Sequence, residues 1–281
     1  MTNSLKQNSK TSQIHLLSYE ELPDYRRLQE NIYIREGYHP APRSWIELWK
    51  LLWSIHSETI NIWTHLIGSL IFLVFLSDSL LHENGNDYLI IVFWDITAFI
   101  TFTSSTLYHW LRVCSKAHDD KCLCIDNFGI ELNAYAMANR FAYYLFNLND
   151  DLCLAYSIIQ SCIFATTLML FYCFWITKDY GKLMNTVFGN KTRLLLNASH
   201  PILLNISIYH HHYDSNDLSR ETGNPCLLGM LIIELILTVT ISIHTSKFPE
   251  SIFPGKFDIY FNSHQIMHVL TLFTSIYVRY L

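Results

Sequence analysis

Apolar stretches recur along the chain after a polar amino-terminal tail. Seven of them are long enough to form membrane helices, covering residues 59–81, 88–112, 123–146, 152–176, 193–213, 226–245 and 258–280. Each is close to the roughly 20 residues that a helix needs to cross the hydrocarbon core. A helix also satisfies its own backbone hydrogen bonds there. The pattern predicts an all-α integral membrane protein with seven transmembrane helices.

Two of these stretches are interrupted by polar residues. The polar side chains in the third and fifth stretches are Asp126, Glu131, Asn133, Arg140, Asn197, His200 and Asn205. Ionisable groups are unfavourable inside a bilayer and are rare there. Six spans with one re-entrant segment is therefore the alternative interpretation.

Lysine and arginine residues mark alternate connections between the stretches. Seven of them precede the first stretch, and others follow the second, fourth and sixth stretches. Residues 82–87 and 147–151 contain none, and residues 214–225 contain only Arg220. Because basic residues gather on the cytosolic side of membrane proteins, we expect a cytosolic amino terminus and a carboxyl terminus outside. This orientation is opposite to that of a G-protein-coupled receptor.

The residues before the first stretch divide into two parts. Residues 1–42 are expected to form a cytosolic tail; the polar run Met1–Lys10 predicts no signal peptide. Residues 43–57 are predicted to form a short interfacial amphipathic helix, because apolar residues recur there at helical spacing. These residues are Trp45, Leu48, Leu51, Leu52 and Ile55. Residues 58–281 then form a single transmembrane zinc-binding domain.

Composition argues against a nucleic-acid-binding protein and against a disulfide-stabilised one. The chain is 51% hydrophobic and 15% charged, with a formal net charge of −5 and no basic tract, so we expect no nucleic-acid partner. Its seven cysteines are scattered, and an odd number without regular spacing does not indicate a disulfide framework.

Four polar residues are expected at one depth near the cytosolic face. His109 lies near the cytosolic end of the second stretch, Asp126 near the start of the third, and His264 and His268 in the cytosolic half of the seventh. His264 and His268 are four residues apart, so one helix presents both imidazoles on the same face. A polar cluster inside a membrane is a functional-site hypothesis by default.

Three histidines with a nearby carboxylate favour zinc. Catalytic zinc sites use three protein ligands and keep the fourth position for water, and zinc lowers the pKa of that water to about 7. Asp126 would accept the proton of the water or orient a ligand, and Ser105, one turn before His109, would bond the water or a substrate oxygen. Three alternatives stay open: a buried polar network without metal, a structural zinc, and a Ser105 hydroxyl bonded to its own helix.

Other polar residues have weaker patterns. Glu58, Asn61 and His65 share one face of the first stretch. They either line the cavity or bond between helices, and we favour the bonds between helices. Asp95 and Glu234 are acids within spans for which no partner can be assigned. Among the other histidines, residues 210–212 are interpreted as an exposed loop and His244 as a cytosolic-side polar group.

The chain resembles the progestin and adipoQ receptor family, in particular its adiponectin-receptor-like branch. The resemblance covers residues 18–281. The motifs that carry it are Glu58-Thr59-Ile60-Asn61-Ile62-Trp63-Thr64-His65, Ser105-Thr106-Leu107-Tyr108-His109, Asp126 with Gly129-Ile130, and Phe253-Pro254-Gly255-Lys256-Phe257-Asp258 continuing to Ser263-His264-Gln265-Ile266-Met267-His268.

This resemblance implies seven helices with the amino terminus inside and a zinc ion held by His109, His264 and His268, with Asp126 and Ser105 beside it. The family is similar to membrane ceramidases. It therefore implies a ceramide-like lipid or fatty acid as partner, an extracellular protein or steroid ligand, and a cytosolic signalling partner for the tail. The compartment is the plasma membrane, or the Golgi membrane if the chain belongs to the branch that sequesters Raf kinase.

The chain departs from the family pattern at three places. The stretch after His109 lacks the second histidine that the family usually has. Asn127 follows Asp126, where the family usually has a tyrosine. Three residues after Pro201 this chain has Leu204, where the family has a histidine. None of these departures removes an expected ligand. They bear on substrate specificity.

Two classes of function follow. The first is a zinc-dependent hydrolase acting on a lipid amide, with Asp126 as the base. The second is a non-catalytic receptor or Golgi scaffold in which zinc is structural. A transporter is disfavoured because the polar residues gather at one depth rather than forming a relay across the membrane.

Overall fold

The protein is all-helical in a computed structural model, which describes residues 15–146, 151–176, 206 and 225–281. No strand occurs within these ranges, where a single isolated bridge joins Leu17 and Tyr38. The described elements are the 3-10 helix η1 (Tyr19–Glu21) and the α-helices α1 (Asp24–Arg27), α2 (Trp45–Leu51), α3 (Thr59–His82), α4 (Tyr88–Leu111), α5 (Lys116–Phe146), α6 (Asp151–Ile176), α10 (Pro225–Ser246) and α11 (Ser263–Tyr280).

Six of the seven predicted stretches coincide with α3, α4, α5, α6, α10 and α11. The fifth, residues 193–213, and the histidines at 210–212 lie outside the described residues, apart from residue 206. In the described part of the chain, four helices are long and apolar enough to cross a membrane, namely α3, α4, and the segments Cys153–Tyr172 of α6 and Leu228–Ser246 of α10. Helices α5 and α11 carry more polar side chains and are not among them.

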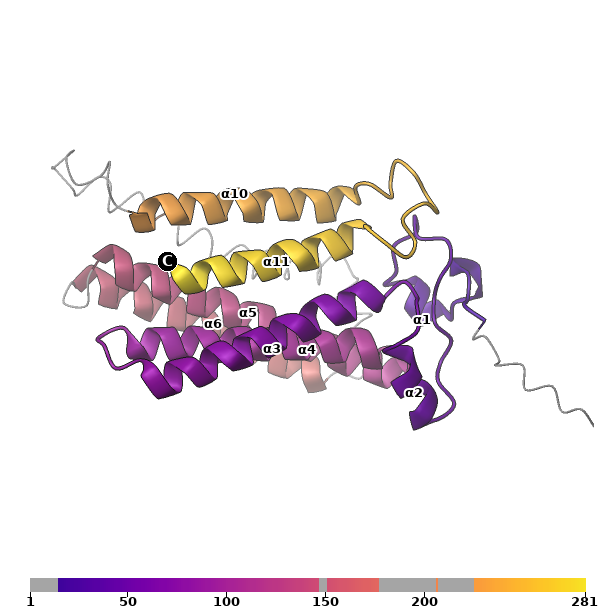
Figure 1. Ribbon diagram of the computed structural model, residues 1–281, viewed down its shortest axis with the longest axis horizontal. Coiled ribbons are helices and arrows are strands. Elements are labelled where there is room, and N and C mark those ends of the chain that lie inside the picture. The colour runs from indigo at the N-terminus through magenta and orange to yellow at the C-terminus, as the bar shows by residue number, and fades with distance from the viewer. Residues whose placement is uncertain (1–14, 147–150, 177–205, 207–224) are drawn as a thin grey trace, which may run out of the picture.

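The long helices lie side by side along the long axis of the molecule (Figure 1). Short connections join α3 to α4 and α4 to α5, so these helices alternate in direction. As a result, one end of the molecule holds the start of α3, the end of α4 and the start of α5. The start of α11 lies at the same end (Figure 1). The amino-terminal segments α1 and α2 lie at this same end.

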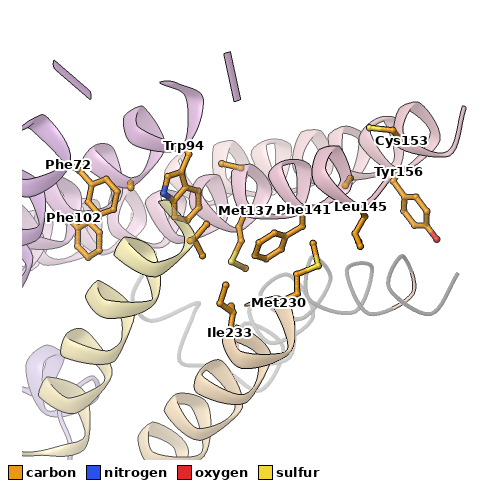
Figure 2. Packing of buried hydrophobic residues seen from close by; sticks show 14 residues of the cluster. Phe72, Trp94, Phe102, Met137, Phe141, Leu145, Cys153, Tyr156, Met230 and Ile233 are labelled. Atoms are coloured by element: carbon orange, nitrogen blue, oxygen red, sulfur yellow. The ribbon is translucent and has the colours of Figure 1, made fainter. Parts of the chain in front are cut away.

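The core is formed by buried residues of α3, α4, α5, α6, α10 and α11 (Figure 2). Its largest fully buried side chains include Trp94, Phe102, Phe141 and Met230. Helix association in membranes depends on close packing rather than on exclusion of water, and small residues at crossings permit it. Gly68 has this role, because a Cβ atom there would lie 2.9 Å from two ring carbons of Phe102 and 3.0 Å from Leu272.

We expect Gly68→Ala to destabilise the protein. Phe102 is fully buried, so over-packing costs about 1–3 kcal/mol, against a helix-propensity gain of up to about 1 kcal/mol. Thermal unfolding in detergent measures the change. Gly85→Ala is the matched control, because the nearest atom to its added Cβ is 4.0 Å away. Equal melting temperatures for the two variants would contradict this account of the crossing.

An amino-terminal layer, residues 15–57, packs against the connection between α10 and α11. Asp258 accepts hydrogen bonds from the backbone amides of Arg35 and Glu36, both at 2.9 Å. Glu250 accepts one from the Asn31 side chain at 2.8 Å and another from the backbone amide of Ser263 at 2.8 Å. The conspicuous motif Phe253–Asp258 therefore contributes to docking this layer beside the first turn of α11.

Helix α2 is shorter than the predicted segment 43–57. Ser44 caps it by accepting a hydrogen bond from the backbone amide of Glu47 at 3.2 Å. Leu48 and Leu51 are buried, whereas Trp45, Trp49 and Trp53 are exposed. Some apolar side chains of this segment thus pack against the protein, and others are exposed on its surface. The position of the segment at a membrane surface stays a prediction.

Candidate metal centre

The first turn of α11 places two histidines together. Asn262 caps the helix by accepting a hydrogen bond from the backbone amide of Gln265 at 3.1 Å, and Glu250 also receives the Ser263 hydroxyl. With the start of the helix held in this way, His264 and His268 project from one face. Their Nε2 atoms are 3.1 Å apart. The i, i+4 spacing in the sequence therefore produces the expected pair.

His109 joins this pair from the end of α4. Its Nε2 atom lies 3.4 Å from the Nε2 atom of His264. The ligand atoms of His109, His264 and His268 all lie within 4.8 Å of one another, and this buried group could hold a metal ion. Residues that are 155 positions apart in the chain therefore meet as the sequence predicts.

Two of the three separations between these nitrogens match those of a tetrahedral metal site. With zinc–nitrogen bonds of about 2.0–2.1 Å, neighbouring ligand nitrogens in a tetrahedral site lie about 3.3–3.4 Å apart. The two Nε2 separations of 3.1 and 3.4 Å are close to this value. Imidazole nitrogen is also a preferred ligand of zinc. The three imidazoles and these two separations are therefore compatible with a bound metal ion.

Glu58 holds His109 from the side opposite the other histidines. Its Oε2 atom lies 2.7 Å from His109 Nδ1. A carboxylate only accepts hydrogen bonds, so Nδ1 carries the proton and Nε2 presents its electron pair to the cluster. Metal-binding histidines commonly have such a carboxylate partner. The sequence predicts an interhelical bond for Glu58, but not that its partner is His109.

Asp126 and Ser105 lie beside the cluster and not within it. Asp126 is buried and interacts with the Ser105 hydroxyl and with His109. Ser105, on α4, is also buried. Asp126 is not part of the group of converging ligand atoms. Its carboxylate therefore lies next to His109 and outside the group of ligand atoms that could hold a metal.

Two further histidines contact the cluster. His65 of α3 stacks on His268, with ring centroids 3.7 Å apart. His244 of α10 has its ring centroid 5.3 Å from that of His264. The sequence singles out both residues but assigns neither to the site. Their spacing along the chain carries no signal of this contact, which depends on how α3 and α10 pack against α11.

Other polar residues belong elsewhere. The Asp95 carboxylate pairs with Arg279 Nε at 2.9 Å and accepts a hydrogen bond from Ser79 at 2.6 Å, so this acid within a span joins three helices. His56 lies between α2 and α3, where Nε2 is 3.1 Å from the Leu51 carbonyl and Nδ1 accepts from the Glu58 amide at 3.2 Å. Burial lowers the pKa of His56 to about 4, so it stays neutral.

Comparison with known proteins places the chain in a family. Residues 53–278, which include the described helices from α3 to α10 and most of α11, match the haemolysin-III related family. The chain belongs to this family. The match covers all the residues of the metal centre, and the resemblance that the sequence motifs indicate is confirmed. Together with four helices that could cross a membrane, it supports an integral membrane protein.

Several relatives of this haemolysin-III related chain carry receptor names. Progestin and adipoQ receptor-like protein 1 of Caenorhabditis elegans is 28% identical over 270 residues, covering 94% of this chain and 59% of the relative. Adiponectin receptor protein of Drosophila melanogaster is 26% identical over 267 residues, covering 93% and 57%. Membrane progestin receptor alpha of Mus musculus is 24% identical over 251 residues, covering 87% and 70%. The chain thus spans less than two thirds of the first two relatives.

Proposed function

We propose that the protein is an adiponectin-receptor-like membrane receptor in which His109, His264 and His268 hold zinc, and that this site hydrolyses a ceramide-like lipid amide. The convergence of the three imidazoles, with the Asp126 carboxylate beside them, carries the proposal. The receptor names of relatives such as the Drosophila protein support the first part. The donor chemistry supports the second.

The roles of the residues follow from their places. Bound zinc would polarise the amide carbonyl and make water a stronger nucleophile. Asp126 would take a proton from the water as it adds to the amide carbon. It would then deliver a proton to the nitrogen as the carbon–nitrogen bond breaks, leaving a fatty acid and a sphingoid amine. Ser105 would hold the Asp126 carboxylate in place through its hydroxyl.

The proposal includes seven transmembrane helices with the amino terminus in the cytosol. The alternation of basic residues along the chain supports this orientation. It places the metal centre near the cytosolic face, because His109 lies at the end of α4 and His264 at the start of α11. A lipid would then reach the site from within the membrane, while a protein or steroid ligand would bind outside and a signalling partner would bind the tail. The compartment is the plasma membrane or the Golgi membrane.

The proposal is tested by ceramide turnover in detergent-free bilayer discs. We expect fatty acid release by the zinc-loaded protein, its loss on chelation, and its return when zinc is added back. Discs that contain the same protein with His268→Ala control for contaminating amidases. Release that persists after chelation, or in the His268→Ala discs, would contradict a zinc-dependent reaction at this site.

One observation favours a second function. A metal at the cluster would tie α4 to α11, and Glu58 would add the start of α3 through His109. Such a link between helices is what a structural zinc provides in a non-catalytic receptor or Golgi scaffold. The free energy of binding a structural zinc also contributes to the free energy of folding. This alternative predicts a large fall in melting temperature on chelation and no ceramide turnover. The catalytic proposal requires turnover by the zinc-loaded protein.

A further inference from the structure

A chain of ion pairs leads from the metal centre into the amino-terminal layer. Arg112, three residues beyond His109, is buried and meets carboxylates of three different segments. Its Nη1 atom is 3.1 Å from Glu58, its Nη2 atom is 3.1 Å from Glu30, and its Nε atom is 3.4 Å from Asp119. Through Glu58, this guanidinium is therefore one contact away from His109.

Glu30 is the member of this chain that belongs to the amino-terminal layer. Its side chain is 9% exposed, and it also lies 3.8 Å from Arg26. Arg26 in turn donates a hydrogen bond to the His39 carbonyl at 2.9 Å. Burial raises the pKa of Glu30, and the Arg112 and Arg26 guanidiniums oppose that rise. Glu30 thus joins the fold of the layer to the charge network of the metal centre.

Glu30 and Glu58 both pair with Arg112, so the position of each carboxylate depends on the other. Glu58 uses Oε1 for Arg112 and Oε2 for His109, with Asn61 also donating to Oε2 at 2.7 Å. Removing one partner of a buried charge leaves the other charges to rearrange. Without the Glu30 charge, Arg112 would shift toward its remaining carboxylates. Glu58 and the His109 ring would shift with it.

We propose that Glu30 is a positioning residue for the metal centre: through Arg112 and Glu58 it fixes His109, so that docking of the amino-terminal layer and metal binding are coupled. This inference rests on the proposed zinc centre. Coupling between two binding equilibria is reciprocal. The layer should therefore raise zinc affinity, and zinc should in turn hold the layer in place.

Zinc affinity measured by competition with a chelator tests the first half of this coupling. We expect Glu30→Gln in the full-length protein to bind zinc several-fold more weakly. The loss should stay below the roughly 10- to 100-fold that removal of a direct partner of a ligand costs, because Glu30 acts through Arg112 and Glu58. Glu36→Gln is the matched control, an exposed acid of the same layer, and should bind as the wild type does. Equal affinities for Glu30→Gln and the wild type would overturn the proposal.

Hydrogen exchange of the wild type tests the second half without any variant, so the test stands even if Glu30→Gln does not fold. We expect removal of zinc to speed exchange in residues 15–40, and this difference to shrink in Glu30→Gln. A purely structural Glu30 would loosen the layer without changing zinc affinity, and that result overturns the coupling. Exchange in the layer that is indifferent to zinc overturns it as well.

Failure of this inference can be distinguished from failure of the zinc centre. If the wild type binds zinc and His264→Ala does not, the centre stands, and the zinc affinity of Glu30→Gln together with the exchange of the layer decides the coupling. A folded wild type that takes up no zinc overturns both proposals.

Discussion

Asp126→Asn is expected to stop lipid-amide hydrolysis while zinc stays bound. Asparagine has nearly the same shape as aspartate but does not take up a proton at neutral pH. Because Asp126 interacts with His109 and lies outside the ligand group, the substitution removes a proton acceptor and leaves the metal ligands intact. Loss of general base catalysis lowers kcat by about 100- to 10,000-fold.

The measurement pairs ceramide turnover with zinc content in the same preparation. Asp78→Asn is the control, because Asp78 is an exposed acid at the other end of α3, where it contacts His82. We expect this control to retain full turnover. Full turnover by Asp126→Asn would rule out its role as the base. Loss of zinc from Asp126→Asn would instead assign Asp126 to metal binding.

His264→Ala is expected to lower zinc affinity by more than the roughly 100-fold that loss of an outer-shell partner costs. His264 has an Nε2 atom within 3.1–3.4 Å of the Nε2 atoms of both other histidines. Its removal leaves His109 and His268 on two different helices with no third ligand. A site with two imidazoles does not meet the three protein ligands that catalytic zinc sites use.

His244→Ala is the matched control for this substitution. The His244 ring lies next to the His264 ring, so both variants remove an imidazole from the same neighbourhood. Only His264 belongs to the group that could hold a metal. We expect His244→Ala to change zinc affinity little. Similar losses in both variants would mean that the ligand set extends to α10, and unchanged affinity in His264→Ala would place the metal elsewhere.

Much of the candidate site could be predicted from the sequence because it depends on local spacing and on depth. His264 and His268 share a helix face in any α-helix. The place of His109 near the end of α4 follows from where the apolar stretch ends. Matched positions relative to the membrane then bring these residues together. The predicted helices follow from the length of the apolar stretches, because a helix needs roughly 20 residues to cross a membrane.

The partners of the buried charges could not be predicted in this way. Glu58 meets His109 and Arg112 because α3 and α4 cross at a particular angle, and nothing in the local sequence encodes that crossing. The same holds for Arg112 and Glu30, which are 82 positions apart in the numbering. Apolar periodicity shows which face of a helix is buried. It carries no information on which ionic groups pair within that face.

Zinc K-edge X-ray absorption on the purified wild-type protein tests the central claim most directly. The account predicts about one zinc per chain with three imidazole nitrogens at about 2.0–2.1 Å. A spectrum with sulfur ligands at about 2.3 Å would place the metal on cysteines instead. That result, or a folded protein free of zinc, would contradict a centre formed by His109, His264 and His268.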